Sequence, residues 1–235
     1  MLTDNQVTRF PNGINNVDVA SIFNSLKCND PTKYHVYFED FDYYNAANWT
    51  VTETQAGATQ ALSNGDGGLM LLTNSAADND VNQIQKVGQS FTFTAGKKLF
   101  FRSIFQVNDA TQSDAVVGIQ VANTDASDLT AVTDGLFFYK ADGATSLSVY
   151  LRKAVASSTT AVVTTMADAT NITVEAFYDG VDRLYYGYNG TIVGYLDASS
   201  TYLPDTSLAP VIEIKNGEAV AKTLTADYIF VAKER

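Results

Sequence analysis

A short acidic run, Glu39-Asp40-Phe41-Asp42, is the strongest catalytic candidate in the sequence. Hydrolysis of a glycosidic bond needs two carboxyl groups that face one sugar linkage, about 5–5.5 Å apart for retention of configuration and wider for inversion. On a strand, Asp40 and Asp42 share a face, because side chains alternate between the two faces of a sheet. This run therefore predicts a glycosidase acid pair, or, as the interpretation we favour, the charged end of an early strand near the rim of a sandwich.

A second acidic segment, Asp78-Asn79-Asp80, has the residue types of a calcium site. Calcium takes roughly six to eight oxygen ligands, and Asp and Asn side chains in one loop can supply several of them. The segment lacks the glycine and the distal glutamate of an EF-hand loop, so a solvated turn is the favoured interpretation. Asp78 and Asp80 remain weak calcium candidates, and no cofactor is expected.

Aromatic side chains raise the question of sugar binding, because their faces stack on pyranose rings. Most aromatic residues here lie inside short apolar runs such as Leu99-Phe100-Phe101, which is typical of core and cross-strand packing. Tyr43, Tyr44 and Trp49 flank a polar segment instead, and we expect them to be the most exposed candidates for glycan contact.

The chemistry of the chain is limited because it has only one histidine and one cysteine. His35 is the only histidine and Cys28 the only cysteine. This excludes disulfides, zinc sites built from His and Cys, and catalytic triads elsewhere in the chain. No convincing catalytic site assembles, so we expect a protein that is not an enzyme.

The net charge of the chain limits the classes of partner that it is expected to bind. The 235 residues include 15 Lys and Arg against 26 Asp and Glu, for a net charge of −11. Nucleic-acid binding needs a basic footprint, and docking on anionic lipid needs basic clusters, so neither partner is expected. No apolar run approaches the ~20 residues that span a bilayer. The polar start, MLTDNQVTRFPNG, does not resemble a signal peptide, so we expect synthesis in a cytoplasm.

From Tyr34 onward the hydrophobic pattern has a period of two or consists of short apolar runs separated by turn signals. This is typical of an antiparallel sandwich or barrel. Asn189-Gly190, between two such runs, predicts a two-residue type I′ hairpin. The Ser/Thr-rich residues 154–169 fit either a polar edge hairpin or a loop. We expect strands at residues 35–41, 49–54, 68–73, 83–93, 98–107, 114–121, 135–139, 146–152, 171–178, 183–188, 191–196, 209–215 and 223–231.

The first 32 residues have a different pattern. Val19, Ile22, Phe23 and Leu26 have helical spacing after a possible N-cap at Asp18. A lone short helix is marginal in water, so its apolar side must pack on its own domain or on a neighbouring subunit. We divide the chain into an N-terminal arm, 1–32, and a β-domain, 33–235. The predicted partner-docking residues of the arm are Phe10, Val19, Ile22, Phe23 and Leu26.

Three segments resemble the concanavalin A-like lectin and glucanase jelly rolls. They are Tyr37-Phe38-Glu39-Asp40-Phe41-Asp42 followed by Trp49, then Gly67-Gly68-Leu69-Met70-Leu71-Leu72, and the hairpin 184–194. The resemblance implies an all-β fold, an antiparallel two-sheet jelly-roll sandwich preceded by a short helical arm. Retaining β-glucanases of that fold carry a Glu-x-Asp-x-x-Glu or Glu-x-Asp-x-Glu run on a central strand, and the sequence contains no such run.

The wider arrangement resembles structural proteins of phage virions. The arm is followed by Asp30-Pro31-Thr32-Lys33-Tyr34, by Gly96-Lys97-Lys98-Leu99-Phe100-Phe101 and by a terminal Asp227-Tyr228-Ile229 segment. The resemblance implies a protein that decorates or cements a phage head, located on the virion surface and bound to the major capsid protein or neighbouring subunits. A homo-oligomer is expected, with a trimer as one form. The alternatives are a carbohydrate-binding module on the virion and, less favoured, a glycoside hydrolase.

Overall fold

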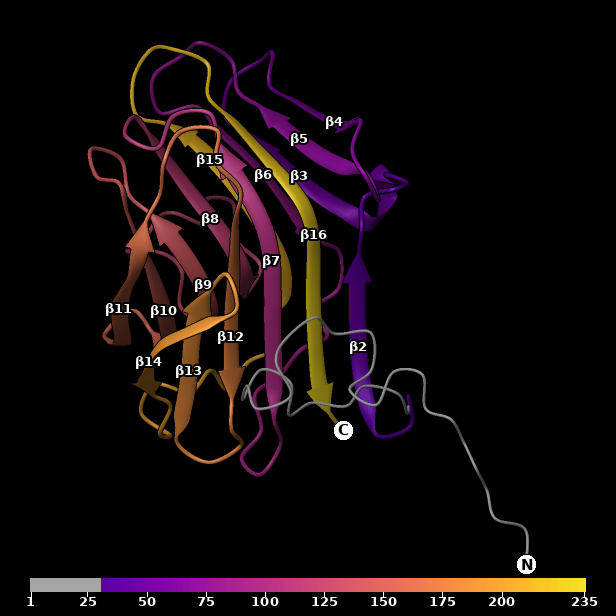
Figure 1. The fold of residues 1–235 in the computed structure, drawn as a ribbon, viewed down its shortest axis with the longest axis vertical. Coiled ribbons are helices and arrows are strands. Elements are labelled where there is room, and N and C mark those ends of the chain that lie inside the picture. The colour runs from indigo at the N-terminus through magenta and orange to yellow at the C-terminus, as the bar shows by residue number, and fades with distance from the viewer. Residues whose placement is uncertain (1–30) are drawn as a thin grey trace, which may run out of the picture.

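The computed structural model describes residues 31–235, which form two antiparallel β-sheets packed face to face (Figure 1). Short strands rich in Val, Thr, Phe and Tyr suit this pleated, half-buried geometry. The elements are β2 (Tyr34–Glu39), the 3₁₀ helix η2 (Ala46–Asn48), β3 (Trp49–Glu53), β4 (Thr59–Ser63), β5 (Leu69–Thr73), β6 (Val81–Lys86), β7 (Leu99–Val107), β8 (Ser113–Gln120), β9 (Gly135–Lys140), β10 (Ser146–Ala154), β11 (Ser157–Thr165), β12 (Ile172–Tyr178), β13 (Arg183–Tyr188), β14 (Thr191–Asp197), β15 (Ala209–Asn216) and β16 (Thr223–Glu234).

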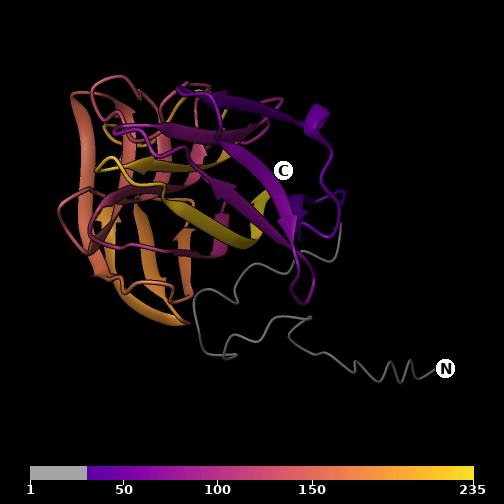
Figure 2. The same cartoon turned by 90° about the horizontal axis from the view of Figure 1, so that it is seen from above.

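The sheets differ in strand order. The seven-stranded sheet runs β11-β10-β9-β8-β15-β6-β3, and the eight-stranded sheet runs β14-β13-β12-β7-β16-β5-β4, with β2 added beside β16. The view from above shows the two layers stacked with a common interior (Figure 2). Many neighbouring strands are far apart in sequence, as in a jelly roll, so no single hairpin determines the fold.

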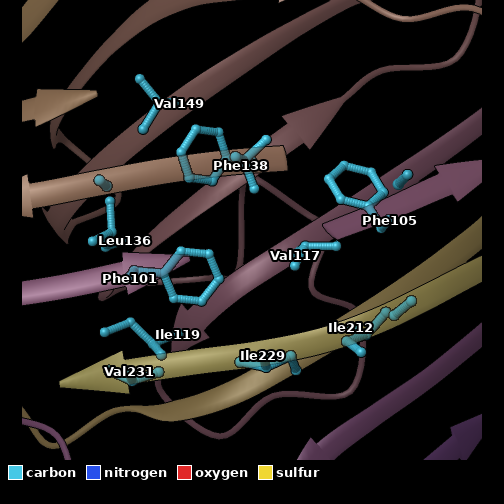
Figure 3. Close-up of a cluster of buried hydrophobic side chains, with 14 of the residues drawn as sticks. Phe101, Phe105, Val117, Ile119, Leu136, Phe138, Val149, Ile212, Ile229 and Val231 are labelled. Carbon is cyan, nitrogen blue, oxygen red and sulfur yellow. The ribbon is translucent and has the colours of Figure 1, made fainter. Parts of the chain in front are cut away.

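The core lies between the sheets. Phe101 of β7 and Phe138 of β9 face each other from opposite layers, with ring centroids 6.1 Å apart (Figure 3). Alternate residues along each strand point inward, and the large inward side chains are almost fully buried. Close packing of this kind makes deletion of core methyl and phenyl groups costly. The core residues labelled in Figure 3 are Phe101, Phe105, Val117, Ile119, Leu136, Phe138, Val149, Ile212, Ile229 and Val231.

The all-β prediction is confirmed, and most predicted strands match those of the structure within a few residues. Asn189 and Gly190 have φ of +48° and +79° and connect β13 directly to β14, as a type I′ hairpin requires. Three elements differ from the prediction. The strand predicted at residues 83–93 is β6, which ends at Lys86, because the chain turns at Gly88, whose φ is +89°. β4 was not predicted, and β11 extends over Ser157–Thr165, where the sequence left a choice between hairpin and loop.

The predicted docking residues Phe10, Val19, Ile22, Phe23 and Leu26 lie outside the described residues. Within residues 31–235, no helix has the length and apolar character needed to cross a membrane.

Candidate functional site

An open cleft of about 450 Å³ lies where the segment after β2 meets the turn between β4 and β5. Strand pairing brings these segments together, because β5 and β2 pair with the same edge of β16. β5 pairs with the first part of β16, and β2 pairs with the last part. The walls combine an aliphatic side chain, a carboxylate, a hydroxyl, an amide and bare glycine backbone. The lining residues are Phe41, Asp42, Leu62, Ser63, Asn64, Gly65, Gly67 and Gly68.

The two walls are in close backbone contact. A Cβ atom on Gly68, whose φ is +104°, would lie 2.2 Å from the carbonyl oxygen of Phe41. Phe41 itself has a φ of +52°, an uncommon conformation for a bulky residue. Its side chain is buried and packs against Trp49, with ring centroids 6.0 Å apart. The left-handed turn at Phe41 therefore anchors the cleft to the core.

This turn corrects the expectation for Asp40 and Asp42. Strand β2 ends at Glu39, so the two aspartates do not occupy alternate positions of a strand. The predicted shared face, on which the acid pair depended, is therefore wrong. Asp42 lines the open cleft and is exposed, whereas Asp40 is half-buried beside Gly67.

The region next to the cleft is strongly acidic. Burial, and then the charges of Asp42 and Asp66, raise the pKa of Asp40. Burial, and then the charges of Asp40 and Asp66, also raise the pKa of Asp227. The neighbouring carboxylates make the local potential negative, and this potential favours the protonated forms of Asp40 and Asp227.

The three predicted glycan-contact aromatics differ in exposure. Tyr43 is 70% exposed, as expected. Tyr44 is half-buried and packs against the core, and its hydroxyl has no hydrogen-bond partner among residues 31–235. Trp49 is only 5% exposed and belongs to the core, so the expectation that it is exposed is wrong. Trp49 is the first residue of β3, and its inward orientation follows from the register of β3 on β6.

The two calcium candidates, Asp78 and Asp80, also differ in burial. Asp78 is exposed, while the buried Asp80 accepts hydrogen bonds from Thr54 Oγ1 at 3.1 Å and from the Ser75 amide at 2.8 Å. Within residues 31–235, no group of three or more His, Cys, Asp or Glu side chains is placed to share a metal ion. Calcium binding at Asp78 and Asp80 stays a prediction.

Sequence reasoning missed several buried ionisable residues, among them Glu213. It lies in the middle of β15 on the outer face of the seven-stranded sheet, meaning the face that points away from the other sheet, and it is fully buried. Its cover is the β8–β9 loop, residues 121–134, whose Ser127 amide donates to Glu213 Oε1 at 2.9 Å. The available signal was a glutamate within the apolar residues 209–214 of β15.

The sequence matches no protein-family model and no curated protein sequence. Solved structures do match. An endo-1,3-β-glucanase from Streptomyces sioyaensis superposes with a TM-score of 0.62 at 14% identity, covering 87% of this chain and 98% of the glucanase. Peanut lectin gives 0.58 at 11% identity, covering 86% and 97%. A glycoside hydrolase family 16 endo-glucanase from Bacteroides ovatus gives 0.57 at 12%, covering 83% and 99%.

The fold is the concanavalin A-like jelly roll. The resemblance in sequence to lectins and glucanases is thereby confirmed at the level of fold. Enzymes and lectins both occur among the matched structures, so the jelly roll is compatible with either activity. Function has to be argued from the side chains of this chain.

Proposed function

We propose that residues 31–235 form a carbohydrate-recognition module without catalytic activity, with its binding site at the cleft of Asp42 and Asn64. The observation that carries the proposal is the composition of that cleft. Carboxylate and amide groups accept and donate hydrogen bonds to sugar hydroxyls, and the exposed ring of Tyr43 follows Asp42 directly. The similarity to peanut lectin and to two glucanases supports a fold suited to glycans.

The Asp40–Asp42 pair predicted from the sequence loses its basis in the structure, which favours binding without hydrolysis. The turn at Phe41 removes the strand spacing on which an Asp40–Asp42 pair depended. The buried Glu213 is covered by residues of the β8–β9 loop, so substrate cannot reach it while that loop is in place. Glycoside hydrolysis requires two carboxyl groups on opposite sides of one sugar bond.

A glycan array tests this proposal. We expect saturable binding by the wild-type protein, with a loss of at least about tenfold in affinity for Tyr43→Ala and for Asp42→Asn. Tyr195→Ala is the matched control, because Tyr195 is also exposed, at 55%, but lies on β14. Absence of saturable binding across the array, or an equal loss in the control, would contradict the proposal.

Hydrolysis of a polysaccharide panel separates binding from catalysis. We expect no release of reducing sugar by the wild-type protein. Hydrolysis that disappears in Asp40→Asn would instead support the glycosidase alternative.

We also propose a second function, based on the resemblance to phage structural proteins. In this proposal the module decorates or cements the capsid of a tailed phage. An exposed apolar surface favours it. Phe38, on β2, is 55% exposed on the outer face of the eight-stranded sheet and contacts Tyr228 and Phe230 of β16. Apolar groups gathered on an outer face mark interaction sites more often than chance. The proposed partner is the major capsid protein or a neighbouring subunit, with a homo-oligomer such as a trimer on the virion surface.

Mass spectrometry of purified virions tests this second proposal. The intact protein should be present in the particles, and deletion of residues 1–30 should reduce its incorporation if the arm docks it. Full occupancy by the truncated protein would contradict arm docking. Absence of the intact protein from the particles would contradict the virion role.

A further inference from the structure

A cross-strand row of side chains runs along the outer face of the eight-stranded sheet, near the end at which β2 begins. Figure 1 looks onto this face, with β14, β13, β12, β7, β16 and β2 side by side in the near layer. Strand register places one residue from each of these strands opposite the next. In this order the residues of the row are Tyr195, Tyr185, Phe177, Phe100, Ala232 and Val36. The row is therefore apolar along its whole length, on a face that antiparallel sheets commonly turn to solvent.

The middle of the row is buried, whereas its ends are exposed. Phe177, Phe100 and Ala232 are only 2%, 3% and 0% exposed. At the two ends, Tyr195 is 55% exposed and Val36 is 39% exposed. The burial is therefore confined to three neighbouring strands, β12, β7 and β16.

The sheet itself covers the sides of this buried middle. Within residues 31–235, the apolar side chains packed against it are Tyr34, Tyr185 and Phe230, all of which belong to the same sheet. Side chains of a sheet stand roughly perpendicular to it, so neighbours of this kind cover the flanks of a ring and leave its tip facing outward. Burial this deep on an outer face therefore indicates a further layer across β12, β7 and β16.

The charge next to the row is compensated within the sheet. Glu175 is fully buried, and its carboxylate accepts hydrogen bonds from Arg102 Nε at 2.7 Å and from the Gly190 amide at 3.0 Å. Because this carboxylate is already paired, an apolar segment can lie across the face without leaving a buried charge uncompensated. The layer that fits this face is apolar on its contact side.

The width of the buried middle matches one helix. Three neighbouring strands span two strand spacings, which is about 10 Å. A helix with its side chains has a diameter of about 10–12 Å. A second copy of the domain needs about 800 Å² on each partner for a stable interface, so it would extend over the exposed ends of the row as well.

The chain that precedes β2 starts beside this row. Tyr34, the first residue of β2, packs against the buried middle, and the Lys33 carbonyl accepts the Arg235 amide at 2.8 Å. The seven residues 27–33 separate β2 from the apolar residues of the arm and can span at most about 23–25 Å. The distance from β2 to β12 is three strand spacings, about 15 Å. The apolar part of the arm can therefore reach the buried middle of the row.

We propose that the N-terminal arm packs on the outer face of its own eight-stranded sheet. The contact joins the apolar residues of the arm that have helical spacing to the buried middle of the row. The residues are Val19, Ile22, Phe23 and Leu26 on the arm and Phe177, Phe100 and Ala232 on the sheet. The glycan cleft takes no part in this contact. An arm that is seated on its own sheet has to leave it before it can dock on a capsid.

A spin label on the arm tests the contact in the purified full-length protein, without glycan or virion. Ser21→Cys combined with Cys28→Ser carries a single nitroxide at a position outside the apolar residues of the arm. We expect strong paramagnetic broadening of the amide signals of Phe177, Phe100 and Ala232. The amide of Thr223, nine residues and so about 30 Å from Ala232 along β16, should keep its intensity.

A mixed sample separates contact within one chain from contact between copies. Isotope-labelled protein with Cys28→Ser alone is combined with spin-labelled protein that carries no isotope. We expect no broadening in this mixture. Broadening here would show that the arm docks on a second copy, and it would overturn the proposal.

Two substitutions in the arm complete the test. Phe23→Asp places a charge among the apolar residues of the arm, so the broadening should become weak and the urea midpoint should fall. Asn24→Asp is the matched control, because it adds the same charge at the next position, outside the apolar residues. It should change neither measurement. Weak broadening before either substitution, or equal effects of the two, would also overturn the proposal.

Discussion

Gly68 and Phe41 are in direct backbone contact: a Cβ atom at position 68 would lie 2.2 Å from the Phe41 carbonyl oxygen. Because this contact joins the β4–β5 turn to the segment after β2, the two walls of the cleft form one unit. The positive φ of Phe41 is maintained by this unit and by the packing of its ring on Trp49. Strained conformations of this kind persist only where the surroundings determine them.

Substitution of Gly68 by alanine should therefore be severely destabilising. We expect Gly68→Ala to lower the free energy of unfolding by about 3–5 kcal/mol, since steric overlap adds to the cost of a positive φ. Gly88→Ala is the matched control, because Gly88 also has a positive φ, of +89°, but open space around its Cβ position. It should cost only about 1–2 kcal/mol. Urea unfolding of both variants measures the difference, and equal costs would argue against the contact.

Trp49, the only tryptophan of the chain, should report occupancy of the cleft. Its ring is buried, so native emission should be blue-shifted and should move to the red on unfolding. Because Phe41 lines the cleft and packs on Trp49, a bound glycan should change the Trp49 emission intensity without unfolding the protein. Titration followed by fluorescence checks this expectation. In Tyr43→Ala the signal should require a higher glycan concentration.

Phe138→Ala should destabilise the domain by about 3–5 kcal/mol, since a fully buried ring is replaced by a cavity between the sheets. Phe38→Ala is the matched comparison, because the same residue type is 55% exposed there. It should cost less than about 1 kcal/mol. Thermal or urea unfolding distinguishes the two. A large loss in Phe38→Ala would mean that the outer face of the eight-stranded sheet is covered.

Asp109 should make stability fall in acid. Hydrogen bonds from Lys222 Nζ and then from the Gln112 amide lower the pKa of Asp109 to about 2, below the ordinary value of 3.8. A depressed carboxyl pKa contributes stability that is complete above the unfolded value and is lost as pH falls through the folded one. Between pH 4 and 2, Asp109→Asn should therefore lose less stability than the wild type. Unfolding measured at several acidic pH values tests this, and parallel curves would contradict it.

Features determined locally were predictable from the sequence. Asn189-Gly190 predicts its own hairpin, because positive φ at two consecutive positions is a local property. Strand β4 was missed because Thr59–Ser63 is mostly exposed and shows no clear alternation of apolar residues. It is a strand because β5 offers it a pairing edge, which depends on the rest of the fold.

The candidate site depended on contacts that a linear pattern does not contain. The period-two prediction for Asp40 and Asp42 failed because a glycine 27 positions away from Phe41 fixes a turn there. Trp49 seemed to follow a polar loop, yet its pairing with Lys86 of β6 turns it inward. The importance of Glu213 arises from a loop 86 positions earlier in the chain.

The pairing of β2 with β16 brings the two ends of the described domain together (Figure 1). The Arg235 amide donates to the Lys33 carbonyl at 2.8 Å, and Tyr34 pairs with Glu234. A domain whose entry and exit lie side by side can be inserted into a surface loop of another protein without stretching its host. The same geometry has a mechanical consequence. Tension applied between residues 31 and 235 would load the hydrogen bonds between β2 and β16 one after another, so β2 should peel away at low force before either sheet is disrupted.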